Sequence, residues 1–380
     1  MASAVPEVLA GGAARRQPDA IRRFDPSDVS PVAELHRRVF NTAPRMDRAL
    51  AADYAAYFDE VFFRHPWTDL DVGSLVMQDA TGISGFLGVV PQPMVYDGTR
   101  LIAARCTQLV VDAEARRRLV GVRLLRELMQ SAADLVIADE ANDAARRIWE
   151  GLGGVTSRLF SLYWACALRP ARLAADWIGR GRGMAAVAWM ARPAAALIDR
   201  LLLRAKRDPS RSQASSTRIE PLDPSRVADF FERAVRQEAI RPVYDESALR
   251  WVLDRARRPA DAGRIEAWQV CDAEEKPIGW FIYGTGTEGM GEVLQLAALP
   301  GREPPVLEQL FEHARRGPSP AIRGRFEPRF WQPLTRTPGL LHRRGPWVLA
   351  HARDREVLHA FEAGRAWCTR LEGEWCLRFR

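Results

Sequence analysis

The sequence contains no Cys-x-x-Cys pair and few cysteines of any kind. Its five cysteines are scattered along the chain, at Cys106, Cys166, Cys271, Cys368 and Cys376. An odd number at irregular spacing does not fit a disulfide framework or a zinc site. We therefore expect no structural metal, and a reducing cytoplasm is the compartment that suits this composition.

Long uncharged apolar runs are also missing. No stretch reaches the roughly 18 residues that a membrane-spanning helix needs. The start, MASAVPEVLAGGAARRQPDA, has no uninterrupted apolar run before its arginines, so we expect residues 1–19 to form a disordered tail rather than a secretory signal. The hydrophobic fraction of 47% over 380 residues is still enough for a large core, and the length suggests two or three domains.

Outside one segment, the positive and negative charges of the chain balance. Between Leu168 and Ser216 there are ten Lys or Arg against three Asp, and this net charge of +7 equals that of the whole chain. Such confinement argues against a nucleic-acid partner. We expect residues 169–216 to be a basic helical connector, interrupted by Gly179, Gly181, Gly183 and Pro193. Either it packs as a helical pair with its arginines in water, or residues 172–207 contact an anionic membrane as an amphipathic segment.

The two flanks of this connector resemble each other. FDPSDVSPVAELHRRVF from Phe24 and LDPSRVADFFERAV from Leu222 both predict a strand end, an Asp-Pro-Ser cap and an amphipathic helix. SGFLGVV at Gly85 is echoed by IGWFIYG at Gly279, and TQLVV at Gln108 by LQLAA at Gln295, with offsets of 198, 194 and 187 residues for the three pairs. We infer an internal duplication.

Both copies predict an α/β sheet with helices on its two faces. The first copy predicts strands at 20–24, 73–79, 83–90, 100–111, 134–138 and 155–167, with helices at 28–40, 46–63, 116–131 and 141–152. The second predicts strands at 217–221, 264–271, 277–284, 291–298 and 321–326, helices at 224–236, 245–257 and 304–315, and C-terminal strands in PWVLAHA and EWCLRF.

The segment VVDAEARRRLVGVRLL, residues 110–125, carries the clearest chemical signal. A strand ends where a helix begins, and the first turn of a helix has free N–H groups that favour an anion. Arg116, Arg117 and Arg118 add positive charge there, and Gly121 permits close approach of a ligand. An arginine-rich first turn that only faces solvent is the alternative.

The first copy resembles the GCN5-related N-acetyltransferase (GNAT) superfamily. Arg116 to Gly121 falls on the family pattern Arg/Gln-x-x-Gly-x-Gly/Ala, and Leu124-Leu125 follow at the expected spacing. A second pattern, Asn-x-x-Ala-x-x-x-Tyr-x-x-x-Gly-Phe, is matched in part by Asn142, Ala145, Trp149, Gly153 and Gly154. The resemblance covers residues 20–168 and, in element order only, residues 217–380. It implies two GNAT-like domains, each a mixed central sheet flanked by helices.

The resemblance also implies binding of acetyl-CoA or another acyl-CoA. The residues it assigns to the cofactor are Leu109, Val110, Val111, Arg116, Arg117, Arg118, Leu119, Val120, Gly121, Val122 and Asn142. Four positions depart from the family patterns, because Leu119 replaces the first Gly, Ala113 a Pro, Trp149 the Tyr that protonates the thiolate, and Gly154 the Phe. Tryptophan has no acidic proton to donate, so another group or water would have to protonate the thiolate.

Candidate catalytic residues lie near the ends of the two central strands. An amine acceptor must lose a proton, and Asp139 and Glu140 are carboxylates at the end of one strand, with Gln108 on the other. Alternatively Asp139 only caps the helix that begins near Ala141. Cys106 is interpreted as a buried apolar residue rather than a nucleophile.

The second copy lacks the phosphate-binding pattern. Its equivalent segment has one arginine, Arg302, and its helix opens with Pro304-Pro305, so we expect it not to bind coenzyme A. The cluster RGRFEPRFW, residues 323–331, is either an acceptor site or an exposed loop. The resemblance thus implies an acyltransferase that acts on an amine or, less readily, a hydroxyl, with an amino sugar of a surface polysaccharide pathway as the leading acceptor. A GNAT-like protein that binds a ligand or partner without turnover is the rival hypothesis.

Overall fold

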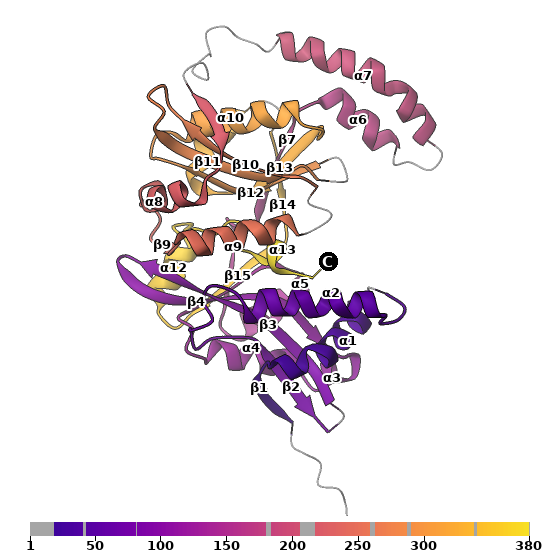
Figure 1. Cartoon of the computed structure of the whole chain (residues 1–380), viewed down its shortest axis with the longest axis vertical. Helices are drawn as coiled ribbons and strands as arrows, with labels where there is room; N and C mark the ends of the chain where they lie inside the picture. Colours follow the sequence, from indigo (N-terminus) through magenta and orange to yellow (C-terminus); the bar gives the residue numbers. More distant parts are fainter. Residues whose placement is uncertain are drawn as a thin grey trace, which may run out of the picture.

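The computed structural model describes residues 19–40, 43–80, 82–179, 184–205, 217–258, 263–286, 290–337 and 340–379. The disordered tail expected over residues 1–19 lies outside this range except for Asp19. Two mixed sheets, each flanked by helices, form the two halves of the molecule (Figure 1). The expected α/β class, with two mixed central sheets flanked by helices, is therefore confirmed.

Sheet A lies in the half that contains the N-terminal elements. In spatial order its strands are β1 (Ala20–Arg23), β2 (Leu75–Asp79), β3 (Gly82–Tyr96), β4 (Thr99–Val111), β5 (Leu135–Ala141), β15 (Trp347–Ala352) and β6 (Val155–Ser157), with β9 (Ile240–Pro242) also paired to β3. Strands β4 and β5 are parallel, and the other neighbours in this order are antiparallel.

Sheet B forms the other half. Its strands in spatial order are β14 (Leu340–Arg344), β7 (Leu162–Ala167), β13 (Ala321–Arg325), β12 (Met290–Ala298), β11 (Pro277–Gly284), β10 (Ile265–Cys271) and β8 (Arg218–Pro221). Within sheet B, β12 and β13 form the one parallel pair among the described strands. Each sheet thus has one parallel pair near its middle.

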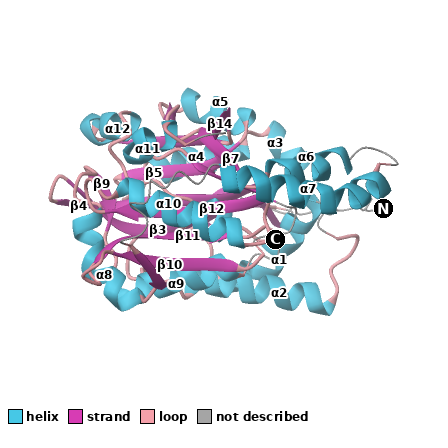
Figure 2. Ribbon diagram, turned by 90° about the horizontal axis from the view of Figure 1, so that it is seen from above, coloured by secondary structure: helices cyan, strands magenta, loops and turns pink. Residues whose placement is uncertain are grey.

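Helices cover both sheets (Figure 2). Those of the first half are α1 (Val29–Phe40), α2 (Arg48–Phe58) with a π-helical turn (Asp59–Phe63), α3 (Ala113–Arg117), α4 (Val120–Met129) and α5 (Asp143–Gly151). The connector forms α6 (Pro170–Gly179) and α7 (Ala185–Ala205). The second copy contributes α8 (Pro224–Ala234), α9 (Glu246–Arg257), α10 (Glu303–Arg316), α11 (Trp331–Thr335), α12 (Arg355–Glu362) and α13 (Glu374–Leu377). Of these, α12 packs against β6 and β15 of sheet A.

The two Asp-Pro-Ser segments begin helices, as the sequence predicts. Asp25 accepts a hydrogen bond from the Ser27 N–H at 2.9 Å, and Asp223 accepts one from Ser225 at 3.0 Å. These caps satisfy N–H groups that have no partner within the helix. The first cap starts a 3₁₀ turn (Pro26–Asp28) that leads directly into α1.

The halves exchange one strand each. Strand β15, from the end of the chain, inserts between β5 and β6 of sheet A. Strand β7, from the first copy, inserts between β13 and β14 of sheet B. A division of the chain at residue 168 therefore does not separate the two sheets, and the strand expected over residues 155–167 is two strands, β6 and β7, in different sheets.

Two further expectations are wrong. The EWCLRF segment forms the one-turn helix α13 instead of a strand, because Gly373 and Glu374 make tertiary contacts with sheet A that are described below. Helix α7 continues through Pro193 without a break. Among the described residues, no helix has the length and apolarity needed to cross a membrane.

The hydrophobic core is continuous between the halves. One cluster contains Phe58 and Phe86 of the first half together with Trp280 and Trp367 of the second. In Figure 1, α9 and α13 lie between the two sheets. The C-terminal segment therefore runs through the boundary at which the two halves meet.

Candidate active site

Strands β4 and β5 separate part way along their length. Their paired residues are Ala103 with Leu135, Ala104 with Val136 and Arg105 with Ile137, and the pairing ends there. Strand β4 continues to Val111 and β5 to Ala141. The sheet thus opens into a wedge, bounded by backbone on both sides, that starts beyond Arg105.

A β-bulge lies on the β4 side of this wedge. Leu109 pairs with Leu87 and Thr107 with Gly88, so Gln108 is an extra residue in β4. Its φ of 52° is unusual for a residue other than glycine. The Gln108 N–H leaves the ladder and donates to Glu374 Oε1 at 3.0 Å. A backbone donor is thereby directed across the wedge.

The carboxylate that accepts this hydrogen bond comes from the C-terminal segment. Glu374 begins α13, and its own N–H donates to Asp139 Oδ1 at 2.8 Å. A Cβ atom on Gly373 would lie 2.0 Å from Asp139 Oδ2, so glycine is required for this close approach. Burial, with smaller effects of the Asp139 and Glu140 charges, raises the pKa of Glu374 to about 7.

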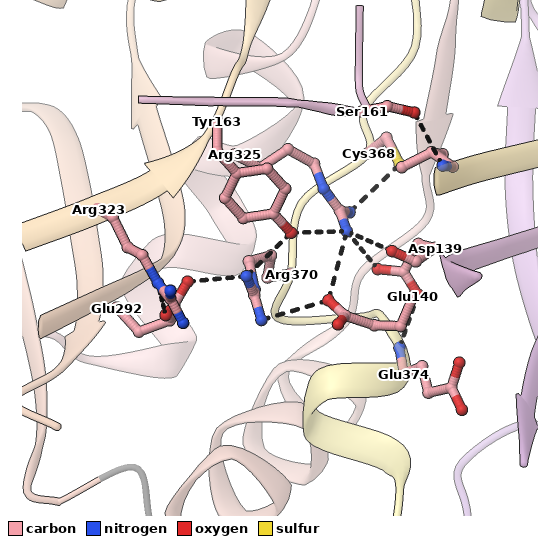
Figure 3. Close-up of polar contacts among 11 residues, drawn as sticks. Asp139, Glu140, Ser161, Tyr163, Glu292, Arg323, Arg325, Cys368, Arg370 and Glu374 are labelled. Carbon is pink, nitrogen blue, oxygen red and sulfur yellow. Dashed lines mark hydrogen bonds and ion pairs between the residues drawn. The ribbon is translucent and has the colours of Figure 1, made fainter. Parts of the chain in front are cut away.

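Asp139 and Glu140 belong to a buried ion-pair network between the sheets (Figure 3). The Arg325 guanidinium lies 2.9 Å from Asp139 Oδ2, and Arg370 lies 3.2 Å from Glu140 Oε1. Burial acts to raise the pKa of Asp139, but Arg325 and the Glu374 N–H hold it below its usual value. A carboxylate held in this way is a weak base, and its geometry is fixed by its partners.

The three predicted catalytic residues, Gln108, Asp139 and Glu140, thus lie at one site. The alternative that Asp139 caps the next helix is wrong, because Asn142 caps α5 by accepting from the Ala145 N–H at 2.9 Å. Sequence reasoning missed Glu374, which lies 235 residues after Asp139 in a segment expected to be a strand. Cys106 is buried, and burial raises the pKa of its thiol, so it is not an activated nucleophile.

The expected phosphate cradle lies at the start of α4. Leu119 adopts the left-handed conformation, with φ of 56°, at the N-cap, and the Arg123 N–H donates to its carbonyl. The N–H groups of Val120, Gly121 and Val122 precede that first helical hydrogen bond, as in any helix start. A Cβ on Gly121 would make only ordinary contacts, the nearest at 3.5 Å to Val111.

Two of the three cradle arginines are available to a ligand. Arg116 and Arg117 are exposed and form no ion pair with another residue in the described part of the chain. Arg118 pairs with Asp79 at 2.5 Å and with Asp19 at 3.4 Å. The Leu119 side chain is 61% exposed, so it points into solvent rather than into the helix start.

The remaining predicted cofactor residues have structural partners. Leu109, Val110 and Val111 form the end of β4 beyond the bulge, and the Asn142 Oδ1 is used by the α5 cap. Trp149, which replaces the family tyrosine, is buried and donates from Nε1 to the Ala350 carbonyl at 3.0 Å. Ala350 belongs to the exchanged strand β15, so this tryptophan fixes the strand exchange.

Aromatic residues close the wedge on the side of the C-terminal segment. Phe379 stacks on Tyr54 with ring centroids 3.9 Å apart, and the Tyr57 hydroxyl donates to the Leu377 carbonyl at 2.7 Å. His36 Nδ1 lies 2.7 Å from the Tyr54 hydroxyl, and burial lowers the pKa of His36 to about 4. His36 is therefore neutral at pH 7.

Sheet B has a similar wedge, which the chain itself occupies. The pairing of β12 with β13 ends at Val293 and Gly324, and Leu294 is the extra residue of a bulge. The Leu294 carbonyl accepts from the N–H groups of Arg370 and Leu371 at 3.0 and 3.1 Å. Helix α10 also has two prolines, Pro304 and Pro305, in its first turn, and proline has no N–H to offer a phosphate.

The cluster at residues 323–331 is not the exposed loop considered above. Arg325 is 3% exposed, and Glu327 is 8% exposed and pairs with Arg329 at 2.8 Å. The Arg329 guanidinium lies 4.1 Å from the centre of the Trp367 ring. These residues join the halves rather than presenting an open surface to an acceptor.

No family model matches the sequence, and no curated protein matches it. Solved structures do resemble the fold. A conserved protein of unknown function from Enterococcus faecalis V583, described as a probable N-acyltransferase, has a TM-score of 0.57 at 13% identity, over 91% of this chain and 74% of that one.

Two further structures are GCN5-related N-acetyltransferases. The one from Anabaena variabilis has a TM-score of 0.56 at 10% identity, over 89% of this chain and 74% of its own. The one from Kribbella flavida has a TM-score of 0.52 at 13% identity, over 87% and 71%. The likeness extends over both sheets, and this chain has the GCN5-related N-acetyltransferase fold.

Proposed function

We propose that this protein transfers an acyl group, acetyl in the simplest case, from acyl-coenzyme A to an amine. The observation that carries the proposal is the wedge between β4 and β5, where the Gln108 bulge N–H and the Glu374 carboxylate face each other at 3.0 Å. A fixed backbone donor and a carboxylate with a pKa of about 7 are the two groups that acyl transfer to an amine requires.

The residues around the wedge fit the group that the fold implies. The free N–H groups at the start of α4, with exposed Arg116 and Arg117, suit a pyrophosphate. The room beside Gly121 suits close backbone contact. The end of β4 at Leu109, Val110 and Val111 is unpaired on its β5 side and can bind the extended arm. Acyl-coenzyme A supplies an activated carbonyl whose C–S bond breaks as the bond to the amine nitrogen forms.

Glu374 is the general base in this proposal. When an acyl carbonyl accepts the Gln108 N–H, the Glu374 carboxylate loses that hydrogen bond and becomes free to accept the amine proton. Asp139 is a positioning residue, because its carboxylate holds the Glu374 backbone at 2.8 Å and is itself fixed by Arg325. Trp149 donates no acidic proton, so the thiolate takes its proton from Glu374 or from water.

The acceptor is an amine, and amino sugars of surface polysaccharides are the first class to test. That choice follows from the family resemblance, and the arginines and aromatic residues at positions 323–331 do not support it, because they are largely buried between the halves.

Release of free thiol from acetyl-CoA, measured with a panel of amino sugars and other primary amines, tests the proposal. With a suitable acceptor, Glu374→Gln should slow release by roughly 100-fold or more, because the amide keeps the acceptor for the Gln108 N–H but cannot take a proton. Glu362→Gln, a change on the exposed end of α12, should leave the rate unchanged. Acetyl-CoA binding without release for any acceptor would support the rival non-catalytic protein, and a wild-type rate for Glu374→Gln would remove Glu374 as the base.

A further inference from the structure

The connector forms a two-helix unit, the α6–α7 hairpin, with an apolar surface that no other described part of the chain covers. Figures 1 and 2 show the two helices side by side at one end of the molecule, away from sheet A. The exposed apolar side chains are Trp177 (74%), Ile178 (46%), Trp189 (70%), Met190 (65%), Leu197 (59%), Ile198 (49%), Leu201 (56%) and Leu202 (41%). Clustered exposure of this extent marks an interaction surface.

The hairpin is held in place by specific contacts. Asp199 of α7 caps α6 by accepting from the N–H groups of Ala171 and Arg172 at 2.8 and 3.0 Å. Arg169 donates to the carbonyls of Arg315 and Gly317 at 2.6 and 2.7 Å, which anchors the hairpin to the end of α10. Its apolar exposure is therefore a property of the folded arrangement.

The exposed residues occupy the outer side of α7. Leu197 lies seven residues after Met190, and Leu201 lies four residues after Leu197. These spacings place the three side chains on one face of the helix. Ala195 and Asp199, four residues apart, are the buried positions within residues 189–202, where the side chains of α7 are described, and Asp199 faces α6. The helix thus presents an apolar stripe outward and uses a different face to hold its partner.

Charge decides which partner fits this stripe. Arg200 is exposed on the same helix, Asp199 accepts the hydrogen bonds that cap α6, and Asp176 and Arg192 form an ion pair at 3.4 Å. The segment from 168 to 216 has a net charge of +7, so a second copy packed against this surface would bring an equal positive charge. An anionic surface complements both the apolar and the basic groups.

We propose that the α6–α7 hairpin binds the surface of an anionic lipid bilayer. Neither helix spans a bilayer, so the hairpin lies in the headgroup region with its apolar stripe toward the acyl chains. Trp177 and Trp189 are suited to that depth because the indole ring is apolar with one N–H for the interface. This inference is independent of the proposed acyl transfer.

Co-sedimentation of the full chain with vesicles of phosphatidylcholine alone, or of phosphatidylcholine with 30% phosphatidylglycerol, tests it. We expect binding to the second composition and a strong decrease at high salt. The double variant Trp177→Ser/Trp189→Ser should weaken binding by roughly tenfold or more, and Arg192→Glu/Arg200→Glu should do the same. The matched controls, Trp331→Ser and Arg257→Glu, change exposed residues outside the hairpin and should bind as wild type does.

Three outcomes would overturn the proposal. They are no vesicle binding by a folded wild-type chain, binding that is equal for both lipid compositions at every salt concentration, and binding that is unaffected by both hairpin variants. A wild-type dimer in sedimentation velocity that the tryptophan variant converts to a monomer, without vesicle binding, would assign the surface to a second copy instead. Circular dichroism of each variant, compared with wild type, establishes that the fold is retained.

Discussion

Leu119 is the residue at which the proposed phosphate cradle departs most from the family pattern. Its left-handed backbone costs about 1–2 kcal/mol for a residue with a Cβ and almost nothing for glycine. We expect Leu119→Gly to stabilise the protein by about 1 kcal/mol in urea unfolding and to tighten acetyl-CoA binding. Leu119→Ala is the matched control, because it removes the exposed side chain but keeps the strained conformation, and it should not stabilise. Equal effects of the two variants would show that backbone strain is not what limits the cradle.

Glu374 couples the site to pH. Its pKa in the folded protein, about 7, is above the ordinary value of 4.5, so its contribution to stability is complete below pH 4.5 and is lost as the pH rises to about 7. Glutamine does not ionise, so Glu374→Gln does not lose this stability as the pH rises. Its free energy of unfolding relative to wild type should therefore increase by roughly 3 kcal/mol between pH 4.5 and pH 8. Urea unfolding of both proteins at pH 5 and pH 8 measures the difference. If the free energies of unfolding of the two proteins changed with pH in the same way, the raised pKa of Glu374 would be contradicted.

Acyl transfer should follow the same ionisation. The proposed base is active when it is deprotonated, so the rate should rise with pH up to about 7 and then level off. The pH dependence of kcat/KM for the wild-type protein measures this. A rate that falls over the same range would contradict Glu374 as the base.

At the scale of elements, α13 is the short helix that connects the C-terminal segment to the wedge. A Cβ at position 373 would lie 2.0 Å from Asp139 Oδ2, so Gly373→Ala should displace α13 and destabilise the protein by roughly 1–3 kcal/mol. The side chain of the neighbouring Trp375 should become more exposed to solvent, and its fluorescence emission should shift to longer wavelength. Gly151→Ala is the control, because a Cβ there meets nothing within 4 Å, and it should be neutral or stabilising.

The positions of most elements could be predicted from sequence, because local periodicity and caps determine them. Asp25 and Asp223 act as the pattern indicates, and strands such as β11 have the expected bounds. The EWCLRF segment could not be predicted, since its conformation depends on contacts of Gly373 and Glu374 with Asp139 and Gln108, more than 200 residues away. The candidate site divides in the same way. A motif pointed to the start of α4 and a strand end pointed to Asp139, but no local signal marked Glu374.

At the scale of the whole molecule, strand exchange makes the halves mutually dependent. Without β15, the facing edges of β5 and β6 have no partner, and without β7 the same holds for β13 and β14. We expect residues 19–205 and 217–380, expressed separately, to aggregate because of these unpaired strands. Co-expressed, the two fragments should form a soluble 1:1 complex that unfolds in one transition. A well-folded, monomeric 19–205 fragment, judged by its NMR spectrum, would contradict this interdependence.

The sequence echoes led to the inferred duplication, but no feature of the sequence indicated the strand exchange. The pattern of β7, Leu162–Ala167, and of β15, Trp347–Ala352, predicts strands in both cases, and either sheet offers each of them an apolar surface. Which sheet a strand joins depends on long-range packing, such as the hydrogen bond from Trp149 to Ala350.

The central claim is that the wedge between β4 and β5, with the helix start at residues 116–122, binds acyl-coenzyme A. Isothermal titration of acetyl-CoA into the wild-type protein and the Arg116→Ala/Arg117→Ala variant tests it most directly, with Arg257→Ala as the exposed control on α9. We predict 1:1 binding that the double variant weakens by roughly tenfold or more and that the control retains. No heat of binding from acetyl-CoA or longer acyl-CoA, with a folded wild-type protein, would contradict the account.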